Sequence, residues 1–211
     1  LQAVFAANPQ LITLPDGKQI WDLLDEKTAR QLKQRLIGVS ADSNRTSRLQ
    51  PWLLATSFTM PDCESYCVLR GIKRLDDMLI EDARARGIKV HSLENIREQI
   101  EIMAAMPFDG QAAHLGALLD PAFTAEDRQE TLIQLYLRRE IGLIFPLMEM
   151  AQKENPKLAG VVRHFGETLI IKRNHVMAER ADPLLRQGGV LIAVGAAHLP
   201  GEEGLVELLR K

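Results

Sequence analysis

The stretch LIAVGAAHLPGEEGL (residues 191–205) is an apolar run that stops at a glycine, presents one histidine and restarts in a second apolar stretch. With the preceding valine, its first part is VLIAV (190–194), which is apolar at every position. That composition is typical of a strand buried on both faces of a parallel sheet. The stretch follows a predicted helix that ends at Gly188 and Gly189, and a new helix is expected after it. It therefore predicts an α/β fold in which His198 lies just beyond the end of a strand.

A second segment, KVHSL (89–93), has the same setting, because it follows a predicted helix that ends at Gly87 and precedes another helix. Two strands do not make a stable sheet. Either QLITL (10–14) adds a third strand or further strands lie outside this sequence, and we favour the latter. We expect residues 1–211 to form a single, helix-rich domain with a small, mostly parallel sheet that helices flank and that is incomplete in this chain.

Most of the remaining sequence has apolar residues at spacings of three and four, the pattern of amphipathic helices. This spacing predicts helices over residues 28–39, 74–87, 96–106, 124–137 and 166–189. Thr124 is expected to cap the fourth of these, with Asp127 three residues later as a near variant of the capping box. Pro183 predicts a kink or a break in the fifth.

The composition excludes several classes of protein. The 211 residues are 46% hydrophobic and 26% charged, as is typical of a globular protein. The net charge is −2, and basic residues alternate with acidic ones, so we expect no binding to nucleic acid. No apolar stretch is long enough to cross a bilayer, so we expect no transmembrane segment. The sequence begins at Leu1 without the pattern of a signal peptide, so we expect it to be part of a longer precursor.

The two cysteines, Cys63 and Cys67, form a single C-x3-C pattern, which is weak evidence for zinc because it supplies only two ligands. An oxidising compartment would favour a local disulfide between them. A helix over these residues would hold the two Cβ atoms in an awkward geometry for that bond. Two ordinary thiols remain an equal alternative.

Chemistry is expected where the two predicted strands end, because ligands of open α/β sheets collect outside the carboxyl ends of the strands. The first strand ends at Leu93 and is followed by Glu94, while the second ends near Gly195 and is followed by His198. A carboxylate and an imidazole at one edge can form a metal site or an acid/base pair. Gly195 is expected to let the chain turn sharply off the strand. The alternative is that His198 only satisfies backbone groups in this turn.

The C-terminal part VGAAHLPGEEGLVELL (194–209) resembles the signature of the TraB/PrgY/GumN family, which is Val-Gly-Ala-x-His-Leu-x-Gly-x-x-Gly-Leu. Upstream, Arg173 with Asn174 and SLENIREQI (92–100) are similar to further blocks of that family, in the same order. LQPW (49–52) and LPDG (14–17) are similar to weaker blocks. The resemblance thus extends over nearly the whole chain.

The resemblance implies a metal-dependent hydrolase, because the family is related to the Tiki proteins, regarded as metal-dependent peptidases, and more distantly to erythromycin esterases. It implies that Glu94, Arg173 and His198 are catalytic, with His198 and Glu94 as ligands of a divalent metal ion (Mn, Co or Zn). Arg173 would steady a developing oxyanion or a substrate carboxylate. Asn174 and Gln99 are expected to orient neighbouring groups at the substrate site, to which Gly195 also belongs.

One part of the family pattern is missing. The family's first Gly-x-x-His has no counterpart before Leu14, so the resemblance implies that residues 1–211 lack the N-terminal strands and that the metal site is incomplete. The resemblance also implies a peptide or small-molecule substrate and a periplasmic or cell-envelope location. The oligomeric state does not follow from the sequence.

Several of these residues could have a purely structural role instead. Arg173 could form an ion pair on a solvated helix face with Glu179 or Asp182. The remaining histidines are expected to be structural or surface residues: His91, His114, His164 and His175. The whole chain could be a non-catalytic ligand-binding module or an interaction protein of the envelope on the same fold.

Overall fold

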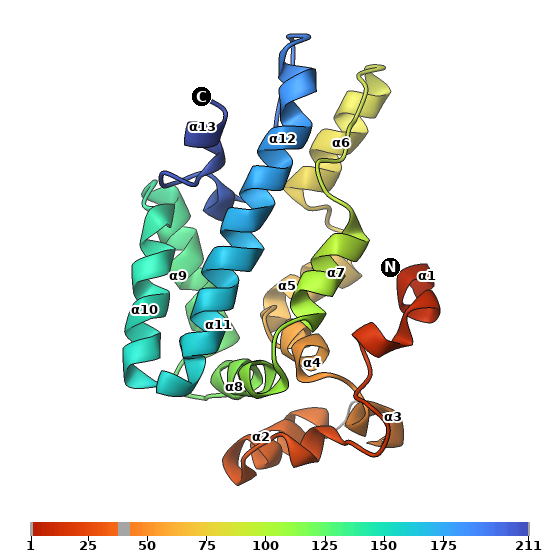
Figure 1. Cartoon of the computed structure of the whole chain (residues 1–211), viewed down its shortest axis with the longest axis vertical. Coiled ribbons are helices and arrows are strands. Elements are labelled where there is room, and N and C mark those ends of the chain that lie inside the picture. The colour runs from red at the N-terminus through yellow and green to blue at the C-terminus, as the bar shows by residue number, and fades with distance from the viewer. Residues whose placement is uncertain (1, 38–42, 211) are drawn as a thin grey trace.

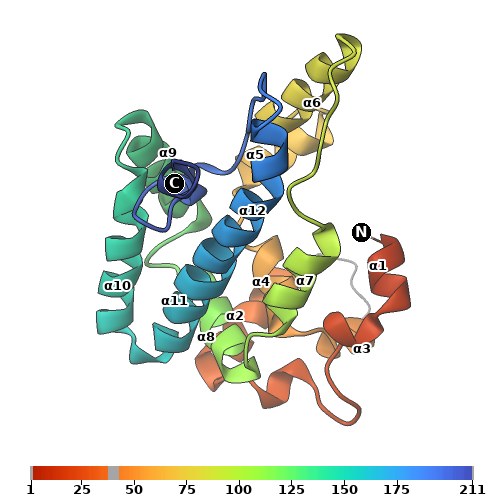
Figure 2. The same ribbon diagram turned by 45° about the horizontal axis from the view of Figure 1, so that its top comes forward.

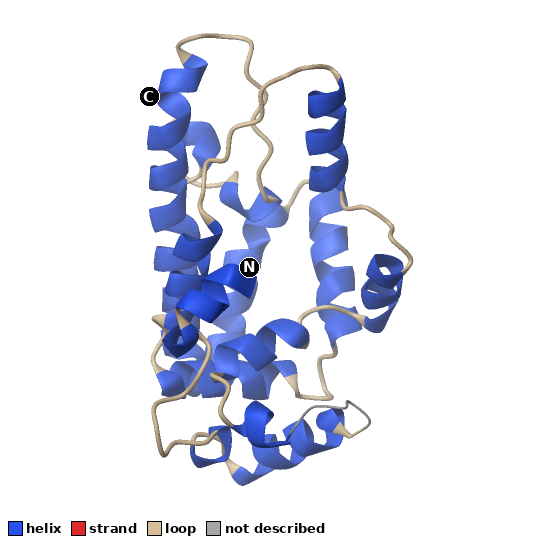
Figure 3. Ribbon diagram, turned by 90° about the vertical axis from the view of Figure 1, so that its right-hand side faces the viewer, coloured by secondary structure: helices blue, strands red, loops and turns tan. Residues whose placement is uncertain are grey.

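The computed structural model describes residues 2–37 and 43–210, and helices make up 67% of the chain. Within these residues no segment forms a strand, and the one β-bridge pairs Thr13 with Leu49 in antiparallel orientation. Figure 3 accordingly shows helices joined by loops. The fold is all-α, and the predicted α/β fold with a small parallel sheet is wrong.

The elements follow one another in a simple order. The α-helices are α1 (Gln2–Ala7), α2 (Glu26–Leu36), α3 (Ser43–Ser47), α4 (Pro51–Ser57), α5 (Asp62–Leu69), α6 (Leu75–Ala85), α7 (Ile96–Ala104), α8 (Phe108–Leu118), α9 (Ala125–Leu137), α10 (Ile144–Glu154), α11 (Ala159–His164), α12 (Arg173–Leu185) and α13 (Leu205–Leu208). Short 3₁₀ turns are η1 (Pro9–Leu11), η2 (Ile20–Asp22), η3 (Ile141–Leu143), η4 (Pro156–Leu158) and η6 (Ala196–His198), and η5 (Phe165–Lys172) is a π-helix. None of the helices described here is both long and apolar enough to cross a membrane.

The segments α11, η5 and α12 form one continuous helix that runs along much of the molecule (Figure 1). The α9–α10 hairpin lies beside it, and α8 crosses near its lower end and packs against α4. The C-terminal helix α13 packs on α12, and the C-terminus lies near α9 in both views (Figure 2). The long helix therefore connects the α8 end of the molecule with the C-terminal segment.

The main hydrophobic core lies where α2, α4 and α8 meet, at the lower end of Figure 1. Its buried members are Leu14, Ile20, Leu32, Leu54, Ala55, Leu115, Leu118 and Leu119. The largest fully buried apolar side chains in it are Ile20, Leu32 and Leu115. The total accessible surface is 14174 Å², against roughly 9,800 Å² for a monomeric globular protein of this mass. The core is therefore small for a chain of this length.

A buried amide joins α8 to the start of α4. Gln111 on α8 is fully buried, and its Oε1 accepts a hydrogen bond of 3.2 Å from the backbone N–H of Trp52. Its Nε2 donates to Gln50 Oε1 at 3.3 Å and to the carbonyl of Met106 at 2.8 Å. Since Gln50 makes no side-chain cap at this helix start, the side chain of Gln111 satisfies one of the donors that a helix N-terminus leaves unpaired.

Most helix ends follow the local signals in the sequence. The side chain of Thr124 accepts a hydrogen bond from the backbone N–H of Asp127, and Asp127 in turn accepts from Thr124, so the predicted capping box begins α9. Gly87 follows α6 at a φ of 72°, which favours glycine. Pro183 lies inside α12, and the helix continues past it to Leu185. Of the two predicted outcomes, a kink or a break, the break at Pro183 is therefore wrong.

The two predicted strands, residues 89–93 and 190–194, are loops, and residues 10–14, the alternative third strand, form turns and a bridge. Residues 89–93 and 190–194 are loop connections after α6 and α12, and none of their backbone N–H groups donates a hydrogen bond to a described residue. Val90 is 43% exposed and Leu191 is 82% exposed. Residues 10–14 instead contribute to η1 and to the single bridge. The pattern predicted extended backbone, but a strand exists only where a neighbouring backbone completes its hydrogen bonds.

The segment of α5 and α6 is the least buried part of the described chain. Neither helix buries a side chain. Cys63 and Cys67 lie one turn apart on α5 and are both free thiols, so the alternative of two ordinary thiols describes this structure.

Candidate functional site

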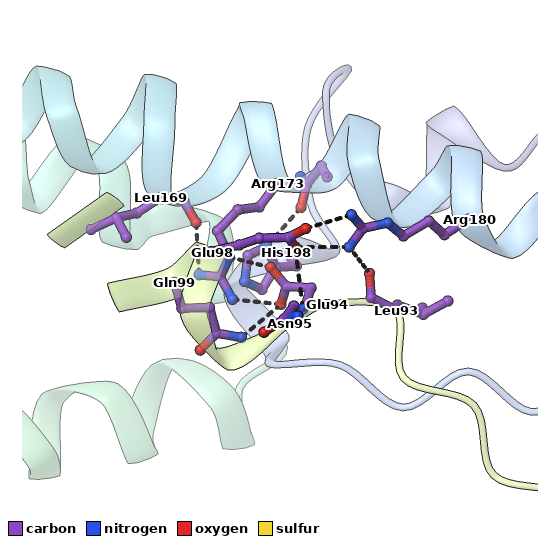
Figure 4. A network of polar contacts seen from close by, with 10 residues as sticks. Leu93, Glu94, Asn95, Glu98, Gln99, Leu169, Arg173, Arg180 and His198 are labelled. Carbon is purple, nitrogen blue, oxygen red and sulfur yellow. Dashed lines mark hydrogen bonds and ion pairs between the residues drawn. The ribbon is translucent and has the colours of Figure 1, made fainter. Parts of the chain in front are cut away.

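The predicted site residues come from three segments that are distant in the sequence. Glu94 immediately precedes the cap of α7, Arg173 is the first residue of α12, and His198 ends the 3₁₀ turn η6. Asn95 caps α7 and forms a reciprocal capping box with Glu98, which places Glu94 just outside the helix N-terminus. Figure 4 shows these side chains gathered beneath α12.

Arg173 and Glu94 form a two-pronged ion pair. Arg173 Nε donates to Glu94 Oε1 at 2.6 Å and Nη2 donates to Oε2 at 2.7 Å, while the two side chains are only 19% and 16% exposed. Gln99 Nε2 donates to Glu94 Oε2 at 3.2 Å, and Arg173 Nη1 donates to the carbonyl of Leu169. The hydrogen bonds from Arg173 hold the pKa of Glu94 below its usual value, so this carboxylate is ionised at neutral pH.

A second ion pair lies two helical turns further along α12. Arg180 donates to both carboxylate oxygens of Glu98, at 2.7 and 2.9 Å, and also to the carbonyl of Leu93 (Figure 4). Hydrogen bonding to Arg180 lowers the pKa of Glu98 to about 2. Together the two arginines fasten α12 to the segment around the start of α7, and so they fix the position of Glu94.

His198 is buried and held in one orientation. Its Nδ1 lies 2.6 Å from Oδ1 of Asn174, a residue that is only 1% exposed, and Asn174 Nδ2 donates to the carbonyl of Glu203 at 2.7 Å. A carbonyl can only accept, so the amide nitrogen of Asn174 must face Glu203 and its oxygen must face His198. Nδ1 of His198 therefore carries the proton. Its Nε2 keeps a lone pair and has no hydrogen-bond partner among the described residues.

The surroundings keep His198 neutral. Burial lowers the pKa of its imidazole, the positive charge of Arg173 lowers it further, and the negative charge of Glu94 acts in the opposite direction. A neutral imidazole with a free Nε2 can accept a proton, bind a metal ion or accept a hydrogen bond from a ligand. His198 can therefore act through Nε2 as a general base or as a metal ligand.

The structure brings Glu94, Arg173, Gln99 and His198 together, although no sheet edge carries them. Arg173 pairs with Glu94, not with the residues of its own helix that were the alternative. Gly195 has a φ of −57°, which any residue adopts, and an added Cβ would make an ordinary contact of 3.6 Å with His198. Position 195 therefore has no conformation that only glycine adopts.

The other histidines differ in their surroundings. His91 is exposed, His164 Nε2 lies 3.0 Å from the carbonyl of Ile102, and His114 is half-buried, with a buried Nδ1 that has no partner among the described residues. His175 lies 2.6 Å from Glu203, next to the site. The sequence patterns did not mark Glu203 as a site residue. The family signature leaves this position unspecified, and the contact with His175 spans 28 residues of sequence.

The described residues do not make a complete site for a divalent metal ion. No group of three or more His, Cys, Asp or Glu side chains in residues 2–37 and 43–210 is placed to hold one. Both oxygens of Glu94, one of the two predicted ligands, are engaged by Arg173. His198 Nε2 is free to bind a metal ion, but three or more protein ligands are typical of such sites.

The helical structure buries an oriented, neutral histidine beside an arginine–glutamate pair. This arrangement is a candidate binding or catalytic site. Residues 2–211 match the sequence profile of the TraB/PrgY/gumN family, so the chain belongs to that family and the resemblance is confirmed. No curated protein and no solved structure matches the chain. The family assignment therefore rests on the profile, which spans essentially the whole sequence.

Removing Arg173 and removing Glu94 are expected to shift the pKa of His198 in opposite directions. Arg173→Gln leaves the negative Glu94 beside the ring and raises the pKa of His198, whereas Glu94→Gln leaves the positive Arg173 and lowers it. An NMR titration of the His198 ring in the three proteins measures both shifts. Shifts in the same direction in the two variants would show that the pair does not act on His198 through its charges.

Proposed function

We propose that this chain contributes a hydrolytic site, peptidase- or esterase-like, in which His198 is the reacting base. The observation that supports this most directly is the orientation of His198: Asn174 holds Nδ1, so Nε2 carries the lone pair and has no partner among the described residues. A base that is neutral near pH 7 and fixed in one tautomer can take a proton from water or from a substrate group without reorganising first.

Arg173 and Glu94 would support that base in different ways. Arg173 uses three of its five N–H groups in the bonds to Glu94 and Leu169, which leaves donors for a developing oxyanion or a substrate carboxylate. Glu94 fixes the guanidinium and balances its charge. Gln99 holds Glu94 from the other side, so it acts on the site indirectly.

Binding of a divalent metal ion stays a prediction that depends on the family resemblance. If one binds, His198 Nε2 is the ligand that this chain offers, and the ion would polarise a scissile carbonyl and acidify bound water. Glu94 would be the second predicted ligand, and a complete site would need at least one more ligand than the described residues place beside these two. The role of Glu94 that its contacts support is to fix Arg173.

A non-catalytic binding site is the second candidate, and one observation favours it. Glu94 and Arg173 neutralise each other, so the described site contains no carboxylate free to act as a second acid or base beside His198. Such a site would accept a hydrogen-bond donor at Nε2 without turning it over.

Hydrolysis of chromogenic esters and fluorogenic peptides distinguishes the two candidates. The assay compares wild type with His198→Ala and with the matched control His91→Ala, in chelator and in added Mn²⁺, Co²⁺ or Zn²⁺. We expect His198→Ala to reduce the rate by about a hundredfold or more, as loss of a general base does, and His91→Ala to leave it unchanged because His91 is exposed. No turnover with any substrate or metal, together with ligand binding that needs His198, would instead support the binding site.

We further propose a periplasmic or cell-envelope location and a peptide or small-molecule substrate, as the family resemblance implies. Fractionation of cells that carry the chromosomal gene with a C-terminal tag tests the location. Recovery of the protein with cytoplasmic markers would contradict it.

A further inference from the structure

Glu203 is held at two points by consecutive residues of α12. Its backbone carbonyl accepts a hydrogen bond of 2.7 Å from Asn174 Nδ2, and its carboxylate Oε2 lies 2.6 Å from His175 Nε2. Asn174 is buried, whereas the side chains of His175 and Glu203 are about half-exposed. One residue of the turn after His198 is thus tied to the helix by both its backbone and its side chain.

The turn that carries Glu203 has little freedom of its own. The backbone N–H of Gly204 donates to the carbonyl of Gly201 at 2.9 Å, and Gly201 has a φ of 90°, which favours glycine. A Cβ on Gly204 would lie 2.3 Å from the carbonyl oxygen of Leu199 and 2.4 Å from that of Pro200, both of them backbone atoms. Residues 199–204 therefore form a closed turn that excludes a side chain at position 204.

We propose that Glu203 is a positioning residue for His198. The contact between its carboxylate and His175 holds the backbone carbonyl of Glu203 against Asn174. That carbonyl fixes the orientation of the Asn174 amide. The amide oxygen then selects the Nδ1–H tautomer of His198. The proposal rests on the proposed function, because a free Nε2 matters most to a hydrolytic base. The tautomer itself can be measured without activity.

The side chain of Glu203 is needed because its contact with His175 holds the backbone carbonyl in place against α12. Without the tie to His175, the turn can move away from α12, the Asn174 amide can rotate, and Nδ1 of His198 can lose its acceptor. The proton can then move to Nε2, which removes the lone pair from the reacting end. Glu202, the preceding residue, is exposed and makes no hydrogen bond or ion pair with a described residue, so it offers a matched control.

Long-range ¹H–¹⁵N NMR of the histidine rings, at about pH 8 where imidazole is neutral, measures the tautomer. Wild type is expected to show His198 as Nδ1–H. In Glu203→Ala the ratio of Nδ1–H to Nε2–H is expected to fall about tenfold, the effect of one hydrogen bond. Glu203→Gln, which keeps an oxygen acceptor for His175, and Glu202→Ala are expected to keep the wild-type ratio.

A wild-type spectrum with the proton on Nε2 would overturn the proposal, and so would a Glu203→Ala spectrum like that of Glu202→Ala. If Glu203→Ala does not fold, His175→Phe removes the same tie from the other side and is expected to give the same loss. Gly204→Ala is expected to disturb the tautomer through the turn. A protein that shows the expected tautomers but hydrolyses nothing would refute the proposed function and leave the role of Glu203 intact.

Discussion

Gln111→Ala is expected to lower the free energy of unfolding by about 3 to 5 kcal/mol. The substitution leaves three buried partners without their hydrogen bond: the N–H of Trp52, Oε1 of Gln50 and the carbonyl of Met106. Each unpaired buried group costs about 1 kcal/mol or more, and the shortened side chain leaves a cavity between α8 and α4. Urea denaturation followed by circular dichroism measures the change.

Gln134→Ala is the matched control, because Gln134 on α9 is exposed and its side chain bonds only to Glu130 one turn earlier. It is expected to change the stability by no more than about 0.5 kcal/mol. Equal losses in the two variants would show that the buried amide does not join α4 to α8 through these hydrogen bonds.

His114 is expected to make the protein sensitive to acid. Burial, with a smaller contribution from the charge of Arg128, lowers the pKa of His114 from 6.5 to about 4. The unfolded chain therefore binds a proton at this residue at a higher pH than the folded protein does. Its contribution to stability is fully present above the unfolded pKa and falls as the pH drops from about 6.5 to about 4, by about 3 kcal/mol in total.

The variant His114→Leu isolates this effect from the other titrating groups. Leucine has no ionisable group and removes the Nδ1 that has no partner among the described residues, so the variant is expected to match or exceed wild type near pH 7. Its advantage is expected to grow by about 3 kcal/mol on acidification to pH 4. His91→Leu, at an exposed position, controls for loss of a histidine. Parallel pH curves for wild type and His114→Leu would mean that His114 titrates normally.

Five of the helices, α2, α6, α7, α9 and α12, could be predicted because their signals are local. The capping box of Thr124 and Asp127 at α9 and the glycine that ends α6 act within a few residues of the elements they bound. The strands could not be predicted correctly from the same kind of signal. VLIAV (190–194) is apolar at every position, but whether it is a strand depends on a second backbone that the sequence of this segment does not contain.

The site shows the same division. Glu94 and His198 were selected by the predicted strand ends as well as by the family resemblance, and Arg173 and Asn174 by the resemblance alone. The structure places the four together although the predicted sheet is absent. The resemblance did not indicate that Arg173 would occupy both oxygens of Glu94. Glu203 and Gln111 were not selected at all, because their partners lie far away along the chain and nothing in the neighbouring residues marks them.

The sequence by itself determined five of the helices, the capping box of α9 and the family to which the chain belongs. Each of these depends on residues that are close together or in a fixed order along the chain. Only the tertiary structure decided that the extended segments stay unpaired, that Glu94 is bound by Arg173 and that His198 presents Nε2. The physical reason is that hydrogen bonds and ion pairs between distant residues depend on which donors and acceptors meet in space. They also depend on which of these polar groups are buried away from water.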